Sequence, residues 1–221
     1  MHFLIHACPA REWYVNDFMI PEMTEQGIPR EDIEVWMDRN NDGCLFSCMK
    51  CFHEVGKRGD GDIWHMQDDV LICRDFKERC EALESFSGIV SGFGCPDFGP
   101  SMSVSGEVPT IFIWFSFQCT RIPNRIAGEC AEWFFNDAIY RDKYRDMVES
   151  RKCDDSFFYD FIAEEHVEDL RGYNCKPCLV EHVDRIIGGS VVNIWRDYWA
   201  RAVYWDDEDL LTELKERIKA R

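Results

Sequence analysis

The sequence contains no apolar stretch that approaches the ~20 residues a membrane-spanning helix needs. Its longest apolar run, residues 111–117, has the length of a buried strand. The first residues carry neither a basic leader nor a long apolar region, so the sequence predicts no signal peptide and a cytoplasmic location. Two nucleotide-binding signatures are also missing: Gly-x-x-x-x-Gly-Lys-Ser/Thr, and Gly-x-Gly-x-x-Gly after the first predicted strand. A P-loop NTPase and a dinucleotide-dependent dehydrogenase are therefore disfavoured.

Basic residues are scarce as well. The chain has 25 Lys and Arg against 42 Asp and Glu, which gives a formal net charge of −17 over 221 residues. That balance disfavours a protein that binds nucleic acid through a broad basic face, and the dense basic region at residues 121–152 has acidic residues interleaved. Hydrophobic residues make up 46% of the chain, which excludes a disordered protein, and the length predicts one large domain.

Predicted strands and helices alternate through the first third of the chain. Short apolar strands at residues 3–6, 33–37 and 62–66 are separated by helical patterns at residues 11–26 and 44–55. This alternation is typical of an α/β protein, so we expect one Rossmann-like domain with a central, mostly parallel sheet flanked by helices. Further along, the patterns predict a helix at 75–86, a strand at 89–92, a Gly/Pro/Ser-rich loop or flap at 93–109, a strand at 110–117, and helices at 126–147, 155–167 and 206–219.

Three polar strings are candidate sites. In Gln67-Asp68-Asp69-Val70 an apolar strand ends in two acidic residues, and carboxylates at the carboxyl end of a parallel strand can hold a divalent cation. The alternative for this string is a turn or a helix N-cap. The pair Asp154-Asp155 precedes an aromatic helix, where an N-cap is again the alternative. His182 follows a short apolar strand and precedes glycines, which fits either a metal ligand beside a phosphate-binding loop or a structural histidine.

The order of these strings resembles the nucleotide-sugar glycosyltransferases of GT-A fold, and looks most like their small lipooligosaccharide and procollagen-galactosyl type. In that family the corresponding strand is commonly followed by Glu-Asp-Asp-Val or Asp-x-Asp. The resemblance covers residues 3–195, and its specific parts are residues 67–70 and 182–190. It implies a single GT-A-like domain over residues 1–221, with a nucleotide-binding half at 1–92 and an acceptor half at 93–221.

The resemblance also implies a metal-dependent transferase that moves a sugar from a nucleotide-diphosphate sugar to a hydroxyl acceptor. Asp69 is expected to coordinate Mn²⁺ or Mg²⁺ and His182 to complete the metal site. Gln67 is also expected at the metal, in the first position of the motif, which is usually acidic. Asp155, or alternatively Asp154, is expected to face the acceptor and, in inverting enzymes, to take the proton of its hydroxyl. The acceptor can be a glycan, a protein or a hydroxylated base in phage DNA, and the net charge weighs against DNA.

Donor-binding residues follow from the same resemblance. The loop after the first strand and the end of the second strand are expected to contact the nucleotide, and the second acidic residue of the motif the ribose or donor sugar. A basic residue close after the histidine is a candidate for charge contact with the diphosphate. The donor-binding candidates are Ala7, Pro9, Arg11, Asp38, Asp68 and Arg185.

Two other functions stay open from sequence. A nucleotidyltransferase can use a similar sheet, but it should show a basic, glycine-rich signature after the first strand, and residues 6–12 lack the glycines. The pairs Cys48-x-x-Cys51 and Cys175-x-x-Cys178 can form a four-cysteine zinc site that staples a non-enzymatic interaction module. Against this, the first pair lies in a helical pattern, where a buried cysteine behaves as a small hydrophobe, and the second pair lies over a hundred residues away.

Overall fold

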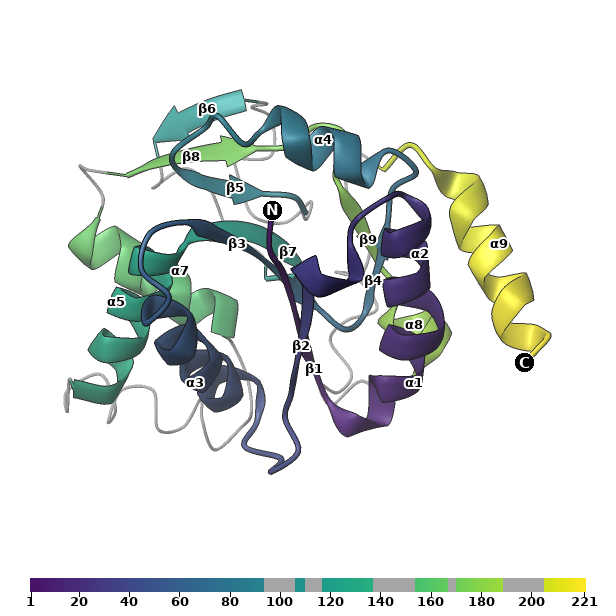
Figure 1. The fold of residues 1–221 in the computed structure, drawn as a ribbon, viewed down its shortest axis with the longest axis horizontal. Coiled ribbons are helices and arrows are strands. Elements are labelled where there is room, and N and C mark those ends of the chain that lie inside the picture. Colours follow the sequence, from purple (N-terminus) through teal and green to yellow (C-terminus); the bar gives the residue numbers. More distant parts are fainter. Residues whose placement is uncertain (94–105, 110–116, 137–153, 167–169, 189–204) are drawn as a thin grey trace.

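The computed structural model describes residues 1–93, 106–109, 117–136, 154–166, 170–188 and 205–221. The main sheet in this part of the chain consists of β1 (Phe3–Ala7), β2 (Ile33–Met37), β3 (Asp62–Gln67), β5 (Ile89–Ser91), β6 (Gly106–Pro109), β7 (Cys119–Pro123) and β8 (Arg171–Asn174). Its seven strands are ordered β2-β1-β3-β7-β5-β8-β6, with helices on both faces (Figure 1). Strands β2, β1, β3, β5 and β8 run in one direction, and β7 and β6 run in the other. The α/β class and the mostly parallel sheet are thus confirmed.

The first three strands confirm the predicted alternation, because each begins and ends within one residue of its predicted range. β1 pairs in parallel with β2 and with β3, so the carboxyl ends of all three strands lie at the same edge of the sheet. The connection from β1 to β2 is helical, as predicted, and stops at Gly27, which takes a positive φ of 83°. It consists of η1 (Pro9–Arg11), α1 (Glu12–Tyr14), the π-helical turn η2 (Val15–Met19) and α2 (Ile20–Glu25), and a short turn, η3 (Arg30–Asp32), precedes β2.

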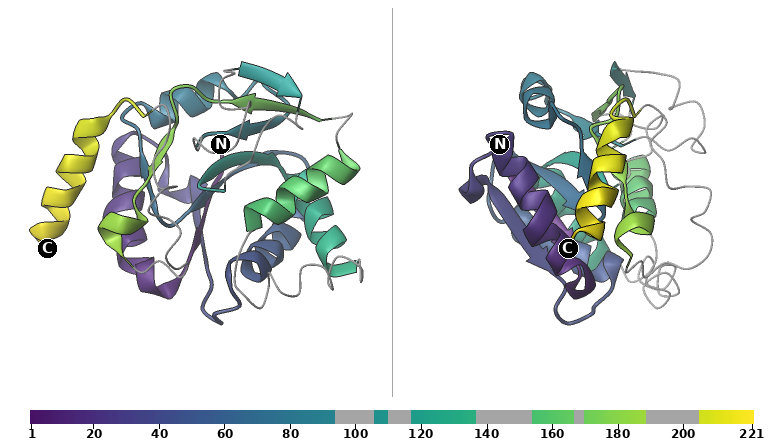
Figure 2. Two further views of the ribbon diagram at one scale, coloured as in Figure 1. Left: turned by 180° about the vertical axis from the view of Figure 1, so that it is seen from behind. Right: turned by 90° about the vertical axis from the view of Figure 1, so that its right-hand side faces the viewer.

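Alternate residues of β1 face two different apolar cores. Phe3 and Ile5 belong to a first core, and Leu4 belongs to a second core on the opposite face of the sheet. The second core lies beneath α3 (Cys44–Gly56), α5 (Asn124–Asn136) and α7 (Asp154–Glu165), which gather on one side of the molecule (Figure 2). A Cβ on Gly56 would lie 2.5 Å from the Cα of Gly128, so the lack of side chains there lets α3 and α5 meet closely.

The first core is covered by α1, α2, α4 (Phe76–Ala82) and α9 (Glu208–Lys219). The last of these confirms the predicted C-terminal helix. Its Leu210 and Leu214 are buried in the first core, and its acidic start and basic end suit the helix dipole. Arg217 of α9 pairs with Glu22 of α2, so the C-terminal helix lies beside the N-terminal helical segment (Figure 1).

A second, two-stranded sheet consists of β4 (Val70–Ile72) and β9 (Val180–His182), which pair in antiparallel orientation. In its register Val70 lies opposite His182. The short helix α8 (Asp184–Ile187) follows directly. This sheet therefore joins the segment after β3 to a segment more than one hundred residues later in the chain.

Several predicted bounds are wrong. α4 ends at residue 82, not 86, and residues 106–109 of the predicted loop form the strand β6. β7 was not predicted, although it lies between β3 and β5, because its sequence Cys-Thr-Arg-Ile-Pro lacks the usual apolar alternation. Other predictions lie largely or partly outside the described residues: the strand at 110–117, the flap at 94–105 and the second part of the helix at 126–147.

The two cysteine pairs do not form a common zinc site. Cys48 and Cys51 lie on α3 and face the second core, whereas Cys175 belongs to the first core. The main sheet therefore separates the first pair from Cys175. The zinc-stapled interaction module therefore lacks the four-cysteine site that it requires.

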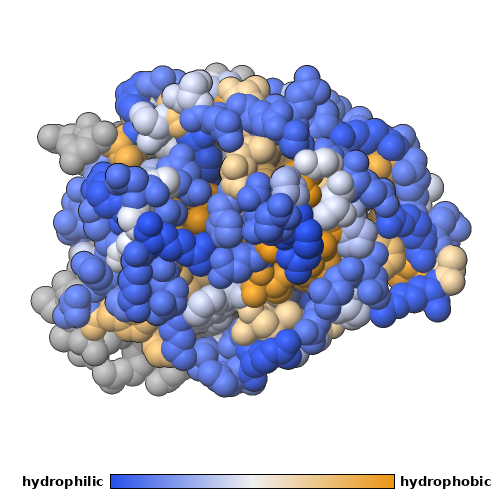
Figure 3. Space-filling model, in the orientation of Figure 1, coloured by the Kyte–Doolittle hydropathy of each residue, from blue (hydrophilic) through white to orange (hydrophobic). Residues whose placement is uncertain are grey.

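The surface agrees with the charged composition. In the orientation of Figure 1 it is mostly hydrophilic, with apolar patches near the middle of the face (Figure 3). No helix in the described part of the chain combines the length and the apolar character that a membrane crossing requires. The predicted absence of a membrane-spanning helix thus holds for these residues.

Candidate metal and nucleotide site

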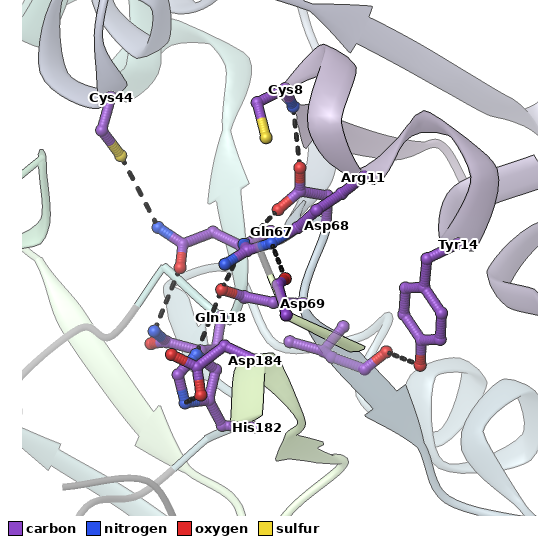
Figure 4. Close-up of polar contacts among 12 residues, drawn as sticks. Cys8, Arg11, Tyr14, Cys44, Gln67, Asp68, Asp69, Gln118, His182 and Asp184 are labelled. Carbon is purple, nitrogen blue, oxygen red and sulfur yellow. Dashed lines mark hydrogen bonds and ion pairs between the residues drawn. The ribbon is translucent and has the colours of Figure 1, made fainter. Parts of the chain in front are cut away.

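The candidate site lies where β1 and β3 end. Asp68 and Asp69 form the turn between β3 and β4, and the pairing of β4 with β9 brings His182 to the same place. The backbone N–H of Val183 donates to the carbonyl of Asp69 over 2.8 Å, which fixes the register. The side chains meet as a result, with 3.1 Å between Asp69 Oδ2 and His182 Nε2 (Figure 4).

Arg11 bridges both acidic residues of the turn. Its Nη1 donates to Asp68 Oδ1 over 2.8 Å and to Asp69 Oδ2 over 2.6 Å. The side chain is only 5% exposed, and its Nε donates to the carbonyl of Gly188 over 3.3 Å. Burial alone would lower the pKa of Arg11, but the two carboxylates outweigh it and raise the pKa above its ordinary value. The guanidinium is thus a fixed positive charge at the centre of the site.

Asp68 is held from the loop after β1 as well. The backbone N–H of Cys8 donates to its Oδ2 over 2.7 Å, so the loop and the acidic turn are tied together. Burial and the neighbouring Asp69 raise the pKa of Asp68, while Arg11 opposes that rise. The site therefore contains two neighbouring carboxylates, an arrangement that a divalent cation can bind.

Asp184 is a site residue that the sequence analysis did not predict. Its Oδ1 lies 3.5 Å from Nδ1 of His182, on the side of the ring opposite to Asp69. A histidine that binds a metal through one nitrogen usually directs the other toward a carboxylate, which fixes the ring orientation. The signal in the sequence is the spacing His182-x-Asp184 at the end of a strand.

The donor atoms fit a divalent cation. Two ligands bound about 2.1 Å from an octahedral ion at right angles are about 3.0 Å apart, and Asp69 Oδ2 and His182 Nε2 are 3.1 Å apart. A carboxylate oxygen suits Mg²⁺ and Mn²⁺, and the imidazole nitrogen favours the transition metal of the two. Because Arg11 also contacts Asp69 Oδ2, a cation bound to that oxygen must displace the guanidinium from it.

Gln67 connects this cluster to Asp154 at the start of α7. Its Nε2 donates to Asp154 Oδ2 over 3.2 Å, and its Oε1 accepts from Gln118 Nε2 over 3.0 Å. The thiol of Cys44 also donates to Asp154 Oδ2, over 3.0 Å. The amide of Gln67, predicted as a metal ligand, is therefore engaged with Asp154 and with Gln118. Figure 4 shows the contact with Gln118.

The acidic groups of two predicted strings, Asp154-Asp155 and Asp68-Asp69, share one electrostatic environment. Burial raises the pKa of the Cys44 thiol well above its ordinary value, and Asp154, Asp155 and Asp69 raise it further, in that order. Asp154 is buried and its Oδ1 accepts the backbone N–H of Asp155 over 3.0 Å, whereas Asp155 itself is half-buried. The two candidates for the acceptor-facing acid thus lie next to the metal cluster but differ in accessibility.

The remaining donor-binding candidates surround the same edge. Ala7 is buried at the end of β1, and Pro9 is exposed in the following turn. Asp38 follows β2 and is turned into its own loop, where its carboxylate accepts the backbone N–H groups of residues 42 and 43. Arg185 is exposed on α8, three residues beyond His182. Residues 189 and 190 of the predicted glycine loop lie outside the described part of the chain.

Comparison with known proteins does not assign a family. No protein-family model matches the chain. A search of curated proteins also found no significant sequence match. The function is therefore inferred from the side chains that meet at the site.

Proposed function

We propose that the protein is a metal-dependent glycosyltransferase of GT-A type, which transfers a sugar from a nucleotide-diphosphate sugar to a hydroxyl acceptor. The observation that carries the proposal is the meeting of three segments that are distant in sequence: Arg11, the Asp68–Asp69 turn and His182. They meet at the carboxyl edge of parallel strands, where α/β proteins bind nucleotides. The resemblance seen in the order of the sequence strings is thereby matched by proximity in space.

In this proposal Asp69 and His182 hold Mn²⁺, or Mg²⁺ with lower preference. When bound there, the cation would supply positive charge to neutralise the diphosphate leaving group. Asp184 fixes the orientation of the His182 ring. Arg11, once displaced from Asp69, presents its guanidinium fork to a phosphate oxygen of the donor, since arginine pairs well with phosphate.

Asp155 is the residue that takes the proton of the acceptor hydroxyl in this proposal. Asp154 already accepts hydrogen bonds from Cys44, Gln67 and the backbone of Asp155, and it is almost fully buried. Asp155 is half-buried at the first turn of the same helix, and its Oδ1 accepts the backbone N–H of Ser156 over 2.7 Å. Asp155 is therefore the proposed general base and Asp154 a positioning residue that holds Gln67.

The proposal is tested with a panel of nucleotide-diphosphate sugars and Mn²⁺, by following release of the nucleoside diphosphate. We expect the native protein to release the nucleoside diphosphate from one donor of the panel. The rate should fall at least a hundredfold in Asp69→Asn, because the cation loses a ligand. The matched control is Asp60→Asn, an exposed residue in the turn before β3, which should keep full activity. Full activity of Asp69→Asn would contradict the metal assignment. Release of pyrophosphate from nucleoside triphosphates, in place of sugar transfer, would contradict the proposed reaction and favour a nucleotidyltransferase.

The two acids of α7 are separated by comparing their amide variants. Asp155→Asn is expected to lower kcat about a hundredfold while the donor KM stays within twofold, because the base acts on the acceptor alone. Asp154→Asn is expected to lower the thermal stability instead, because three donors lose their charged acceptor. The reverse pattern would exchange the two roles.

A further inference from the structure

A second cluster of metal-binding side chains lies behind the candidate site, in the second core. His6 on β1 and His65 on β3 project from the same face of the sheet toward α3, and Cys48 lies on the face of α3 that meets them. One ligand atom from each of His6, Cys48 and His65 lies within 4.8 Å of the other two. All three side chains are buried, at 7%, 0% and 0% exposure.

The local sequence explains this convergence. β1 and β3 are parallel neighbours, with Leu4 opposite His65 and His6 opposite Gln67, so the two histidines are diagonal neighbours on one face. Their ring centroids are 5.8 Å apart. Cys44 and Cys48 are four residues apart on α3 and therefore share its inward face.

The partners of the two imidazoles differ in strength. His6 Nε2 lies 2.9 Å from Ser47 Oγ, which gives that ring a hydrogen bond. His65 lies between the rings of Phe52 and Phe117, at centroid distances of 5.3 and 4.9 Å, and its Nε2 lies 3.9 Å from Cys48 Sγ. A buried imidazole is costly unless a strong partner compensates for lost hydration, and a thiol at that distance is a weak one. A neutral imidazole keeps a lone pair on one ring nitrogen, and this is the form of histidine that binds a metal.

We propose that His6, Cys48 and His65 bind one Zn²⁺ ion. In a tetrahedral site with Zn–N near 2.1 Å and Zn–S near 2.3 Å, nitrogen and sulfur ligands are about 3.6 Å apart, close to the 3.9 Å between His65 Nε2 and Cys48 Sγ. Cys44 is outside this ligand set, because its Sγ groups with His6 and Asp154 and donates to Asp154 Oδ2 over 3.0 Å.

Zinc binding at this place would fix the edge that carries the candidate site. His6 immediately precedes Ala7 at the end of β1, and His65 lies two residues before Gln67 at the end of β3. On binding, Cys48 would exchange its S–H proton for a Zn–S bond, and the proton would pass to solvent. The site is chemically distinct from the Asp69–His182 pair, because it uses a thiolate and no carboxylate ligand.

The test uses the full chain, reduced and stripped of metal with a chelator, and titrated with Zn²⁺ or with Co²⁺ as its spectroscopic substitute. The titrations are made in the Asp69→Asn background, so that the other candidate cation site is disabled and the result is independent of transferase activity. We expect one equivalent of bound metal, a thiolate-to-cobalt charge-transfer band and a higher Tm. Absence of the band, or binding of no zinc, would overturn the proposal.

Variants locate the site. Cys48→Ala should lose the band and weaken Zn²⁺ binding at least a hundredfold, whereas Cys51→Ala, a buried cysteine of the same helix outside the cluster, should retain both. His65→Gln serves as the second variant, with far-ultraviolet circular dichroism as the check that the chain is folded. A band that persists in Cys48→Ala, or that disappears only in Cys8→Ser beside Asp68, would place the metal elsewhere and refute the assignment.

Discussion

The buried bridge between Arg11 and the acidic turn makes Arg11→Met a sharp test of the candidate site. The guanidinium lies 2.8 Å from Asp68 Oδ1 and 2.6 Å from Asp69 Oδ2, and Arg11 is only 5% exposed. Removing one partner from a buried ion pair costs about 3–5 kcal/mol, because the remaining charge keeps its desolvation penalty. For a chain of this length that loss lowers the Tm by about 6–20 °C in metal-free buffer.

The matched control is Arg39→Met. Arg39 pairs with Glu12 at the same distance, 2.8 Å, but the two side chains are 67% and 40% exposed. A surface pair of this kind contributes about 0.2–1 kcal/mol. The free energies of unfolding of the two variants, measured in urea, therefore show whether the loss in Arg11→Met comes from burial of the ion pair. If any arginine–carboxylate contact were enough, both variants would lose the same stability.

Adding Mn²⁺ extends the test from stability to function. In the native protein the cation must displace Arg11 from Asp69, and in Arg11→Met it meets no such competition. We therefore expect Arg11→Met to bind Mn²⁺ at least tenfold more tightly, and to regain about 2.7 kcal/mol when the ion is present at a hundred times its Kd. Two results would refute the reasoning: a variant no less stable than Arg39→Met, or equal stabilisation of the native protein and Arg11→Met by Mn²⁺.

Three further predictions concern other parts of the fold. Gly128→Ala should lower the free energy of unfolding by about 1–3 kcal/mol in urea, because its Cβ meets the backbone of α3; a neutral effect would contradict that helix contact. Burial lowers the pKa of His65, so below pH 6.5 the unfolded chain binds more protons, and the metal-free fold loses up to about 1.4 kcal/mol per pH unit. His65→Gln should reduce this slope of stability against pH, and the exposed-site control His53→Gln should keep it. Asp184→Asn should weaken Mn²⁺ binding about 10–100-fold by calorimetry, because His182 loses its orienting carboxylate; unchanged affinity would remove that role.

The sequence predicted the elements that local patterns specify. β1, β2 and β3 are apolar runs bounded by turns, and the helix between β1 and β2 stops at Gly27, so a short window contains the necessary information. β7 lacks such a pattern. Its Arg121 is 2% exposed because the guanidinium donates to the carbonyls of Leu83, Phe86 and Gly88. These partners lie more than thirty residues away in the sequence, so the local pattern around Arg121 does not indicate them.

The candidate site shows the same division between local and long-range information. The Asp68–Asp69 turn could be placed at a strand end from its own neighbours. Its contact with His182 depends on the pairing of β4 with β9, and the bridge to Arg11 depends on the loop after β1. The positions of Asp184 and His6 relative to these groups likewise follow from strand register, which no single motif specifies.

The placement of β7 has a consequence for the order in which the sheet is completed during synthesis. β3 and β5 come from residues 62–67 and 89–91, but the strand that joins them comes from residues 119–123. At about 5–20 residues per second, the ribosome needs roughly 1–6 s to add the intervening segment. During that interval β3 and β5 each carry an open backbone edge able to pair with another chain. A fragment cut near residue 92 would keep both edges permanently, and would be expected to aggregate even though it contains the acidic turn.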